Sequence, residues 1–275
     1  MPYDPSSILL TDRVAVVTGV GSGIGRATAV LLSRFGATVA MCDRVADTLA
    51  DTEIAVADAG RPALARVLDV RDAPAVEAFI GEVREAHGRV DILVNNAGGT
   101  FVTPFLDLSQ KGEDTLVAEN FTQVTRLVRL VVPLMTEGGS IVNVTSIEAH
   151  QAAPGFAVYA AMKSALAQLT QTLALELAPQ RIRVNAIAPD AIPTEGDRGV
   201  RTEMLTGAGE YEPSVVPPLG ELGTPEDAAA VVVFLASDLA HFVNGTTIHV
   251  DGGSRAAGGW RRATTASYPG DEPSD

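Results

Sequence analysis

Tyr159 and Lys163 stand four residues apart in the segment Tyr-Ala-Ala-Met-Lys. On a helix, residues with this i, i+4 spacing share one face, so the phenol and the ammonium can act on the same ligand. A free tyrosine has a pKa of about 10 and is a poor base at neutral pH. A neighbouring ammonium favours the tyrosinate and lowers that pKa. The pair therefore predicts a tyrosine that gives and takes a proton, although the same pair also occurs on ordinary solvated helices.

Two further polar residues precede this pair in the chain. Ser146 ends an apolar run, 13 residues before Tyr159, and its hydroxyl can bond to a substrate oxygen. Asn120 falls in the middle of an expected helix, where its side chain can hold a water molecule beside Lys163. Thr145 is an alternative hydroxyl, but neighbours on a strand point to opposite faces. The predicted catalytic residues are Asn120, Ser146, Tyr159 and Lys163.

A glycine-rich segment, TGVGSGIG, runs from Thr18 to Gly25 between an apolar run and an amphipathic one. Backbone N–H groups at such a turn, and at the start of the following helix, bind an anion such as a pyrophosphate. Glycine lets the backbone approach closely and adopt a positive φ. A tight turn without any ligand is the alternative interpretation. The residues predicted to contact a dinucleotide here are Gly19, Gly21, Ser22, Gly23, Ile24 and Gly25.

Asp43 ends the second apolar run, 18 residues after Gly25. A carboxylate at that place accepts hydrogen bonds from ribose hydroxyls and repels a 2′-phosphate, which favours NAD over NADP. Arg44 follows it, and a guanidinium there can instead pair with a 2′-phosphate. Position 20 holds Val20 rather than a basic residue. The sequence therefore predicts NAD as the cofactor, with Asp43 and Arg44 beside the ribose and NADP as the alternative.

The elements that position these residues follow from the alternation of apolar and amphipathic stretches. Strands are predicted at 13–19, 37–43, 65–70, 90–96, 140–146, 181–189 and 246–253. Helices are predicted near 24–35, 47–57, 73–87, 113–136, 158–178 and 225–236. Continuously apolar strands are buried on both faces, and alternating strands and helices build a parallel sheet. The predicted fold is α/β, a single doubly wound, Rossmann-like domain with a seven-stranded parallel sheet flanked by helices.

The composition is that of a globular chain of 275 residues, 46% of them apolar. The net charge of −14 argues against nucleic acid as a partner, because phosphate binding needs a basic face. A single cysteine, Cys42, excludes an internal disulfide, and four histidines without zinc-ligand spacing predict no metal. No run approaches ~20 apolar residues, and the first residues lack a signal-peptide pattern. We therefore expect a cytoplasmic protein without a membrane segment.

Together these motifs resemble the short-chain dehydrogenase/reductase family, in the subgroup with TGxxxGxG, NNAG and YxxxK. The likeness spans roughly residues 12–253 and includes Asn-Asn-Ala-Gly at 95–98 and the ending NGTTIHVDGG at 244–253. One departure is Pro189-Asp190, where the family usually has Pro-Gly, followed by an unusual Pro193.

The resemblance implies further cofactor contacts and an assembly. It places Asp69 and Val70 at the adenine, Asn96, Ala97 and Gly98 at the nicotinamide ribose, and Ile192 and Thr194 at the carboxamide. It also implies that Tyr159 and Lys163 contact the cofactor, that Lys163 binds ribose hydroxyls, and that the protein is a homotetramer.

Residues 1–253 are predicted to form the catalytic domain, and 254–275 a C-terminal extension whose end is mobile. Residues 190–224 follow the sixth strand and are rich in Gly, Pro, Thr and Glu, which predicts a substrate lid. Trp260 is a candidate anchor of the extension. The residues expected to line the substrate cleft are Thr100, Phe101, Val102, Glu148, His150, Gln151 and Phe156.

The function implied by the resemblance is NAD(H)-dependent interconversion of a secondary alcohol and a ketone. The expected substrate is a small hydrophobic molecule, such as a steroid, a terpenoid or an acyl-coenzyme A thioester. A 3-oxoacyl-[acyl-carrier-protein] reductase is the first alternative. Acyl carrier protein is acidic, so the net charge of −14 disfavours its docking. A non-catalytic dinucleotide-binding regulator is the alternative of another class.

Overall fold

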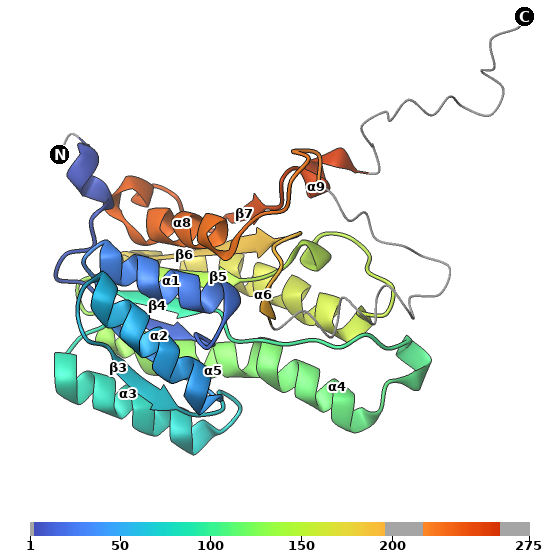
Figure 1. Cartoon of the computed structure of the whole chain (residues 1–275), viewed down its shortest axis with the longest axis horizontal. Helices are drawn as coiled ribbons and strands as arrows, with labels where there is room; N and C mark the ends of the chain where they lie inside the picture. The colour runs from blue at the N-terminus through green and yellow to red at the C-terminus, as the bar shows by residue number, and fades with distance from the viewer. Residues whose placement is uncertain (1–2, 196–216, 259–275) are drawn as a thin grey trace, which may run out of the picture.

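The computed structural model describes residues 3–195 and 217–258 (Figure 1). These residues contain one parallel sheet, in the order β3-β2-β1-β4-β5-β6-β7. Its strands are β1 (Val14–Thr18), β2 (Thr38–Asp43), β3 (Leu64–Val67), β4 (Ile92–Asn95), β5 (Gly139–Val144), β6 (Ile182–Pro189) and β7 (Thr247–Val250). The predicted seven-stranded α/β fold is therefore confirmed.

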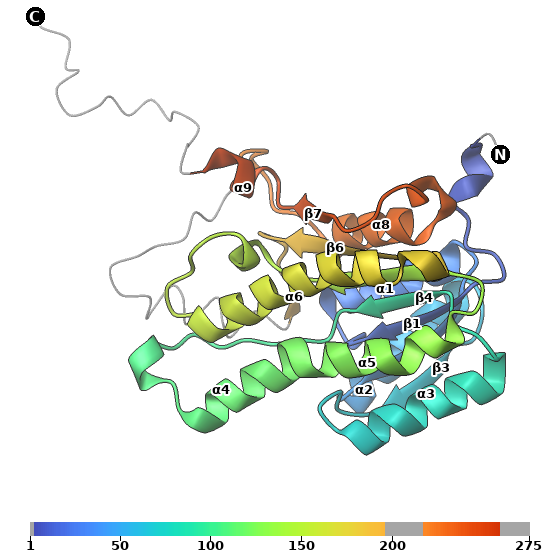
Figure 2. The same ribbon diagram turned by 180° about the vertical axis from the view of Figure 1, so that it is seen from behind.

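Helices cover both faces of the sheet. One layer lies in front of the sheet in Figure 1: α1 (Gly23–Arg34), α2 (Ala46–Ala59) and α8 (Pro225–Ala236). The other layer faces the viewer in Figure 2: α3 (Ala73–His87), α4 (Gln110–Val117), α5 (Gln123–Val131) and α6 (Ala157–Glu176). Two clusters of buried apolar side chains, one on each face, fill the space between sheet and helices. The strands are thus buried on both sides, as their continuous apolar runs predict.

The strand order reverses next to β1, because β1 pairs with β2 on one edge and with β4 on the other. In open parallel sheets, ligands bind outside the carboxyl ends of the strands at such a reversal. Thr18 ends β1 and Asn95 ends β4, so both open toward this place. The fold therefore brings the glycine-rich turn and the NNAG motif to one edge.

Several predicted bounds differ from the structure; β5 ends at Val144 and β7 at Val250, before the predicted 146 and 253. Two further differences have a local cause. The helix predicted over 113–136 is divided by a π-helical turn at Ala118–Thr122. The strand predicted over 65–70 already ends at Val67, because the Asp69 carboxylate accepts the backbone N–H of Arg71 and makes a local turn.

Part of the predicted domain layout lies outside the described residues. The sheet and its helices fall within the predicted catalytic domain, and the short helix α9 (Ser254–Ala257) begins the predicted extension. The predicted lid includes 196–216, which the described ranges do not contain, and Trp260 lies beyond them as well. The division at residue 253 and the lid stay predictions.

Candidate active site

The tyrosine and the lysine of the YxxxK motif lie on α6, with the lysine fully buried. Nζ of Lys163 donates a hydrogen bond to the carbonyl oxygen of Val144, at the end of β5, at 3.0 Å. The same atom lies 5.5 Å from the centre of the Tyr159 ring. Burial lowers the pKa of Lys163 to about 8, and the carboxylates of Glu148 and Glu119 oppose this shift. The two side chains meet as their spacing predicts.

Ser146 lies directly after β5 and is buried. Its hydroxyl donates a hydrogen bond to the carboxylate of Glu148, which belongs to the short helix η5 (Ile147–Ala149). The hydroxyl of Thr145 instead donates to the carbonyl oxygen of Ile187 at 2.6 Å. The Thr145 hydroxyl therefore bonds to the sheet backbone, and the Ser146 hydroxyl, whose partner is a side chain, is the better candidate for contact with a substrate.

Glu148 was predicted only as a pocket residue, and its bond to Ser146 was not foreseen. Burial raises the pKa of the Glu148 carboxyl, and the hydrogen bond from Ser146 opposes this effect. A carboxylate two residues after a serine at a strand end is a pattern from which the contact can be predicted, because short polar side chains bond locally in turns.

Asn120 lies in the π-helical turn between α4 and α5 and is buried. Its Nδ2 donates to the carbonyl oxygens of Gly99 at 2.8 Å and of Leu116 at 3.0 Å. Its Oδ1 accepts the backbone N–H of Gly99 at 3.4 Å. The extra residue of a π turn re-aims side chains, and such turns occur frequently at functional sites. Here the turn directs Asn120 at the chain that follows the NNAG motif.

Gly98, the last residue of NNAG, lies between the Asn120 amide and the Lys163 ammonium. A methyl group on Gly98 would lie 2.8 Å from Oδ1 of Asn120 and 3.3 Å from Nζ of Lys163. Both polar atoms therefore converge on the small space that the absent side chain leaves. A water molecule beside Lys163, as predicted for Asn120, has an acceptor and a donor in this space.

The glycine-rich turn forms a close-packed cradle before α1. Gly19 and Gly23 have φ of 69° and 55°, in the left-handed region. A methyl group on Gly19 would lie 2.8 Å from Cα of Ala97, and one on Gly25 would lie 2.0 Å from the carbonyl oxygen of Gly19. Asn96 fixes the turn, because its Nδ2 donates to the carbonyl oxygens of Thr18 at 3.0 Å and Gly19 at 2.8 Å.

The start of α1 completes this cradle. Ser22 precedes the helix at the N-cap and makes no side-chain cap bond, and the residues that follow are Gly23, Ile24 and Gly25. Backbone N–H groups of a first helical turn that no side chain caps are donors for an anion. The close backbone approach and these donors fit the pyrophosphate of a dinucleotide.

Asp43 lies at the carboxyl end of β2, beside the turn. Its carboxylate accepts the backbone N–H of Gly21 at 2.8 Å and that of Val45 at 2.9 Å. These two bonds hold the side chain in place at the rim of the cradle. Arg44 is exposed, and its charge acts on Asp69 and Glu119, where it lowers the pKa of each carboxyl as a minor contribution.

The carboxylate of Asp69, predicted at the adenine, is engaged by a neighbouring arginine. Nε and Nη2 of Arg71 donate to it at 2.9 Å and 2.5 Å, and these bonds lower the pKa of the Asp69 carboxyl. Arg71 also lies 3.8 Å from the carboxylate of Glu119, in the π turn. Val70 is half-buried beside this pair. The sequence did not predict roles for Arg71 and Glu119, whose ion pairs connect Asp69 to the π-helical turn that contains Asn120.

The two residues predicted at the carboxamide, Ile192 and Thr194, follow β6. Ile192 is buried in the core on the α1 side. A methyl group on Gly23 would lie 2.8 Å from Cγ2 of Thr194, so Thr194 reaches across to the glycine-rich turn. The unusual Asp190 extends the ladder between β6 and β7, since its N–H donates to the carbonyl oxygen of Val250 at 3.1 Å.

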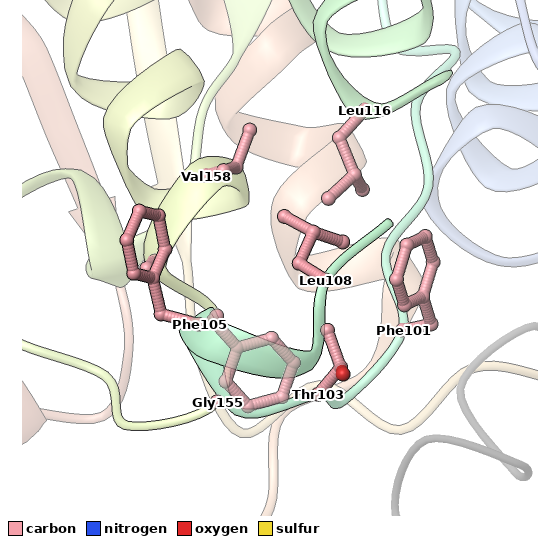
Figure 3. A pocket seen from close by; sticks show the side chains of 9 residues that line it. Phe101, Thr103, Phe105, Leu108, Leu116, Gly155 and Val158 are labelled. Carbon is pink, nitrogen blue, oxygen red and sulfur yellow. The ribbon is translucent and has the colours of Figure 1, made fainter. Parts of the chain in front are cut away.

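The predicted cleft residues divide into two groups. Of these, Phe101 and Phe156 line a small pocket, together with Thr103, Phe105, Leu108, Leu116, Gly155, Ala157 and Val158 (Figure 3). The lining is mostly apolar, and the ring of Phe156 lies 6.3 Å from that of Tyr159. Val102 packs beside Gly155, whose added methyl group would lie 3.0 Å from it, and Thr100 is half-buried between the pocket and NNAG.

His150 belongs to the second group, away from this pocket. Its ring lies 4.7 Å from that of His249 on β7, and Nη1 of Arg255 donates to its carbonyl oxygen at 2.5 Å. Gln151 is exposed. His150 therefore flanks the site on the side of β7.

No helix within 3–195 or 217–258 is long and apolar enough to cross a membrane. In the same ranges, no three His, Cys, Asp or Glu side chains gather in a group that could hold a metal ion.

One edge of the sheet carries both a candidate dinucleotide site and a candidate proton-transfer site. The glycine-rich turn, Asp43 and Thr194 outline a place for an extended dinucleotide. Tyr159, Lys163 and Ser146 supply a proton-transfer group, a cation beside it and a hydroxyl. A nicotinamide dinucleotide, when bound, supplies or accepts a hydride, and the surrounding residues supply orientation and proton transfer.

Comparisons with known proteins identify the family of the chain. A family model described as enoyl-(acyl carrier protein) reductase matches residues 19–255. The 3-oxoacyl-[acyl-carrier-protein] reductase of Thermotoga maritima is 38% identical over 248 residues, which cover 89% of this chain and 98% of that protein.

Solved structures show the same likeness with either cofactor. Carveol dehydrogenase from Mycobacterium avium, in complex with NAD, is 30% identical with a TM-score of 0.82, over 89% of this chain and 98% of that one. A putative 2-deoxy-D-gluconate 3-dehydrogenase from Agrobacterium tumefaciens, with bound NADP, is 31% identical with a TM-score of 0.80, over 91% of this chain and 99% of that one. This chain thus belongs to the short-chain dehydrogenase/reductase family and is an oxidoreductase.

Proposed function

We propose that the protein interconverts a secondary alcohol and a ketone with NAD(H) as the hydride carrier. The observation that carries the proposal is the buried Nζ of Lys163, held by Val144 and 5.5 Å from the ring of Tyr159. A cation in that place favours the tyrosinate, so Tyr159 can pass a proton to or from the substrate oxygen near neutral pH.

The other polar groups complete this assignment. When substrate binds, the hydroxyl of Ser146 turns its single proton from Glu148 to the substrate oxygen, orients that oxygen and stabilises the charge that develops on it. Asn120 holds a relay water molecule in the space beside Gly98, on which its Oδ1 and Nζ of Lys163 converge. Lys163 also binds the ribose hydroxyls of the cofactor. The protein thereby supplies orientation and proton transfer around a hydride that comes from the nicotinamide.

NAD is the proposed cofactor, and relatives are known with NAD and with NADP. Support comes from Asp43, whose carboxylate is held at the rim of the cradle by the N–H groups of Gly21 and Val45. A fixed carboxylate at this position repels a 2′-phosphate. Arg44 is exposed and belongs to no ion pair among the described residues, so it can turn away from the ribose.

The proposed substrate has an apolar skeleton, such as a steroid, a terpenoid or an acyl-coenzyme A thioester. Support comes from the apolar side chains at the start of α6, among them Phe156, whose ring lies 6.3 Å from that of Tyr159. A 3-oxoacyl-[acyl-carrier-protein] reductase remains the second candidate, because a relative with that name is 38% identical. The net charge of −14 favours the first candidate, since acyl carrier protein is itself acidic.

The experiment is a substrate panel followed by NADH absorbance. Purified protein is given secondary alcohols of increasing apolar size, 3-hydroxyacyl-coenzyme A thioesters and 3-hydroxyacyl carrier protein, each with NAD or NADP. We expect turnover of free alcohols with NAD and none by a Tyr159→Phe variant. A clear preference for the carrier-protein substrate would support the second candidate. Cofactor binding without turnover of any substrate would indicate a non-catalytic regulator instead.

A homotetramer in the cytoplasm is the proposed state. Leu175 on the outer side of α6 is 78% exposed. A large exposed apolar side chain on an outer helix is a candidate contact for another subunit, as in the assembly that the family resemblance implies. Light scattering at micromolar concentration should give four times the chain mass of 28.5 kDa, and a monomer would contradict this assignment.

A further inference from the structure

Glu148 is an acidic side chain placed directly beside the reacting groups. Its carboxylate accepts the hydroxyl of Ser146, and the side chain is half-buried on η5. The backbone of Ser146 leads from β5 into η5, so both residues lie at the carboxyl edge of the sheet. Glu148 is therefore one hydrogen bond away from the hydroxyl that is proposed to hold the reacting oxygen.

The charges around Glu148 leave it short of donors. Within the described residues, Glu148 forms no ion pair, and its carboxylate is bonded by the Ser146 hydroxyl and by its own backbone N–H. Lys163 attracts it from α6, but Nζ of that lysine donates to Val144. Asp190, at the end of β6, repels it.

The groups on the outer flank do not relieve this shortage. His150 stacks against His249, and Arg255 donates to the carbonyl oxygen of His150. Burial raises the pKa of the Glu148 carboxyl, although the hydrogen bonds from Ser146 and from its own backbone N–H oppose this shift, so the charge is held there by neutral donors alone. A ligand that brings a further donor to Glu148 would lower that cost.

Because the Glu148 carboxylate is a direct hydrogen-bond partner of the Ser146 hydroxyl, a substrate oxygen bound to Ser146 would lie one group away from that carboxylate, and a substituent on the neighbouring carbon could contact it. A hydroxyl on that neighbouring carbon is a donor of the right size, since the two oxygens of a vicinal diol are separated by one carbon–carbon bond. We propose that Glu148 is a specificity-determining residue that selects vicinal diols and α-hydroxy ketones, by accepting a hydrogen bond from the hydroxyl next to the reacting carbon. The inference rests on the proposed function.

The same geometry rejects other substituents. A carboxylate next to the reacting carbon would meet the like charge of Glu148, so we expect 2-hydroxy acids to be poor substrates. A methyl ether has the size of the hydroxyl but no proton to donate, and it leaves the carboxylate unpaired. A site built to bond a substrate hydroxyl discriminates strongly against an analogue that lacks it. The predicted substrate is thus an apolar skeleton that carries a hydroxyl beside the reacting carbinol.

The test uses a matched set built on the secondary alcohol that the panel shows to be oxidised fastest. The set contains the parent alcohol, the same alcohol with a hydroxyl on the neighbouring carbon, and the methyl ether of that hydroxyl. The measured quantity is the ratio of kcat/KM for the diol to kcat/KM for the methyl ether, with NAD saturating. Full-length wild-type protein is compared with Glu148→Gln, Glu148→Leu and, as a control, Glu77→Gln at an exposed position on α3.

We expect wild-type protein to favour the diol over the methyl ether by about tenfold or more, because a hydrogen bond to a charged group separates them. Glu148→Gln keeps an acceptor oxygen without the charge and should lower the ratio. Glu148→Leu should bring the ratio close to one. Glu77→Gln should leave it at the wild-type value.

The design separates this inference from a merely structural role and from the proposed function. Loss of support for Ser146 would reduce kcat on all three substrates alike and leave the ratio unchanged in Glu148→Leu, which would overturn the inference. Equal use of diol and methyl ether by wild-type protein would also overturn it, while alcohol oxidation as such would stand. Absence of turnover on every alcohol would instead overturn the proposed function.

Discussion

Asn120 and Gly99 bind each other through two hydrogen bonds, one from the side-chain amide to the glycine carbonyl and one from the glycine N–H to the amide oxygen. This reciprocal pair fastens the π-helical turn to the chain just beyond NNAG. The turn thereby connects the helical layer that contains α5 with the end of β4. We call this reciprocal pair of Asn120–Gly99 hydrogen bonds the clasp, and the same amide is also a candidate water ligand.

Replacing Asn120 by aspartate tests the clasp. The Nδ2 of Asn120 donates to two carbonyl oxygens, of Gly99 and Leu116, and a carboxylate would face both without a proton. We expect Asn120→Asp to lower the free energy of unfolding by about 1–3 kcal/mol, the cost of buried groups left unsatisfied, and to reduce kcat. Urea unfolding and steady-state kinetics provide the readings. Gln180→Glu, which adds the same charge at an exposed position, should change neither, and equal stability of the two variants would refute the clasp.

Removing the phenol hydroxyl tests the proton donor. Tyr159→Phe should lower kcat by about 10²- to 10⁴-fold, because no other described side chain lies over Lys163 with a hydroxyl to offer. The fold should persist, since the ring that contacts Phe156 is retained. Circular dichroism and NADH-linked turnover measure both effects, with Tyr3→Phe as the matched control. A Tyr159→Phe variant that keeps a tenth of wild-type activity would exclude the assigned role.

The buried lysine predicts a pH dependence of stability in the cofactor-free protein. Its pKa is about 8 in the fold against 10.5 for a free side chain, so between these values the unfolded chain binds a proton that the native chain does not. The stability of wild-type protein relative to Lys163→Met should therefore rise as the pH increases from 8 to 10.5, by an amount on the order of 3 kcal/mol.

Urea unfolding of both proteins across this pH range measures the difference. Lys111→Met, at an exposed position, is the control for the loss of a lysine. A stability difference between wild type and Lys163→Met that stays flat with pH would show that Lys163 keeps an ordinary pKa.

Replacing glycine by alanine should have opposite effects on stability in the crowded cradle and on the open surface of α3. Gly25→Ala would place a methyl group 2.0 Å from the carbonyl oxygen of Gly19 and 2.4 Å from Nδ2 of Asn96, so the turn must open. We expect loss of dinucleotide affinity and a lower melting temperature. Gly81→Ala in α3 meets nothing within 4 Å and should stabilise the protein by up to about 1 kcal/mol. Calorimetric titration and thermal melts measure these effects, and normal NAD affinity in Gly25→Ala would place the pyrophosphate elsewhere.

Cofactor preference depends on the charge of Asp43. Wild-type protein should prefer NAD over NADP by at least about tenfold in kcat/KM, the effect of ~1.4 kcal/mol of repulsion at the 2′-phosphate. Asp43→Asn keeps an oxygen for the N–H groups of Gly21 and Val45, so it removes the charge with little damage to the turn. Asp43→Ala removes both. NADP use should rise in both variants, and NAD use should fall more in Asp43→Ala. Equal use of the two cofactors by wild-type protein would mean that Arg44 decides the preference.

The sequence predicted the sheet because its strands are continuously apolar and its motifs stand at strand ends. The pairing of Tyr159 with Lys163 was equally predictable, since both lie on one helix. The π turn at Asn120 was not, because one extra residue hardly changes the apolar pattern of a helix. The engagement of Asp69 by Arg71 and of Glu148 by Ser146 depends on local turn geometry after strands, which periodicity does not describe.

The position of β1 in the middle of the sheet has a consequence for biosynthesis. All five residues of β1 are buried, and one of its two edges is completed only by β4, which begins at Ile92. While the chain emerges from the ribosome, β2 can pair with β1 early and β3 with β2, but the other edge of β1 stays unpaired until Ile92–Asn95 has been made. Such an edge is a template for pairing with other chains. The nascent protein is therefore most prone to aggregation in that interval, and a chaperone that covers β1 would protect it best then.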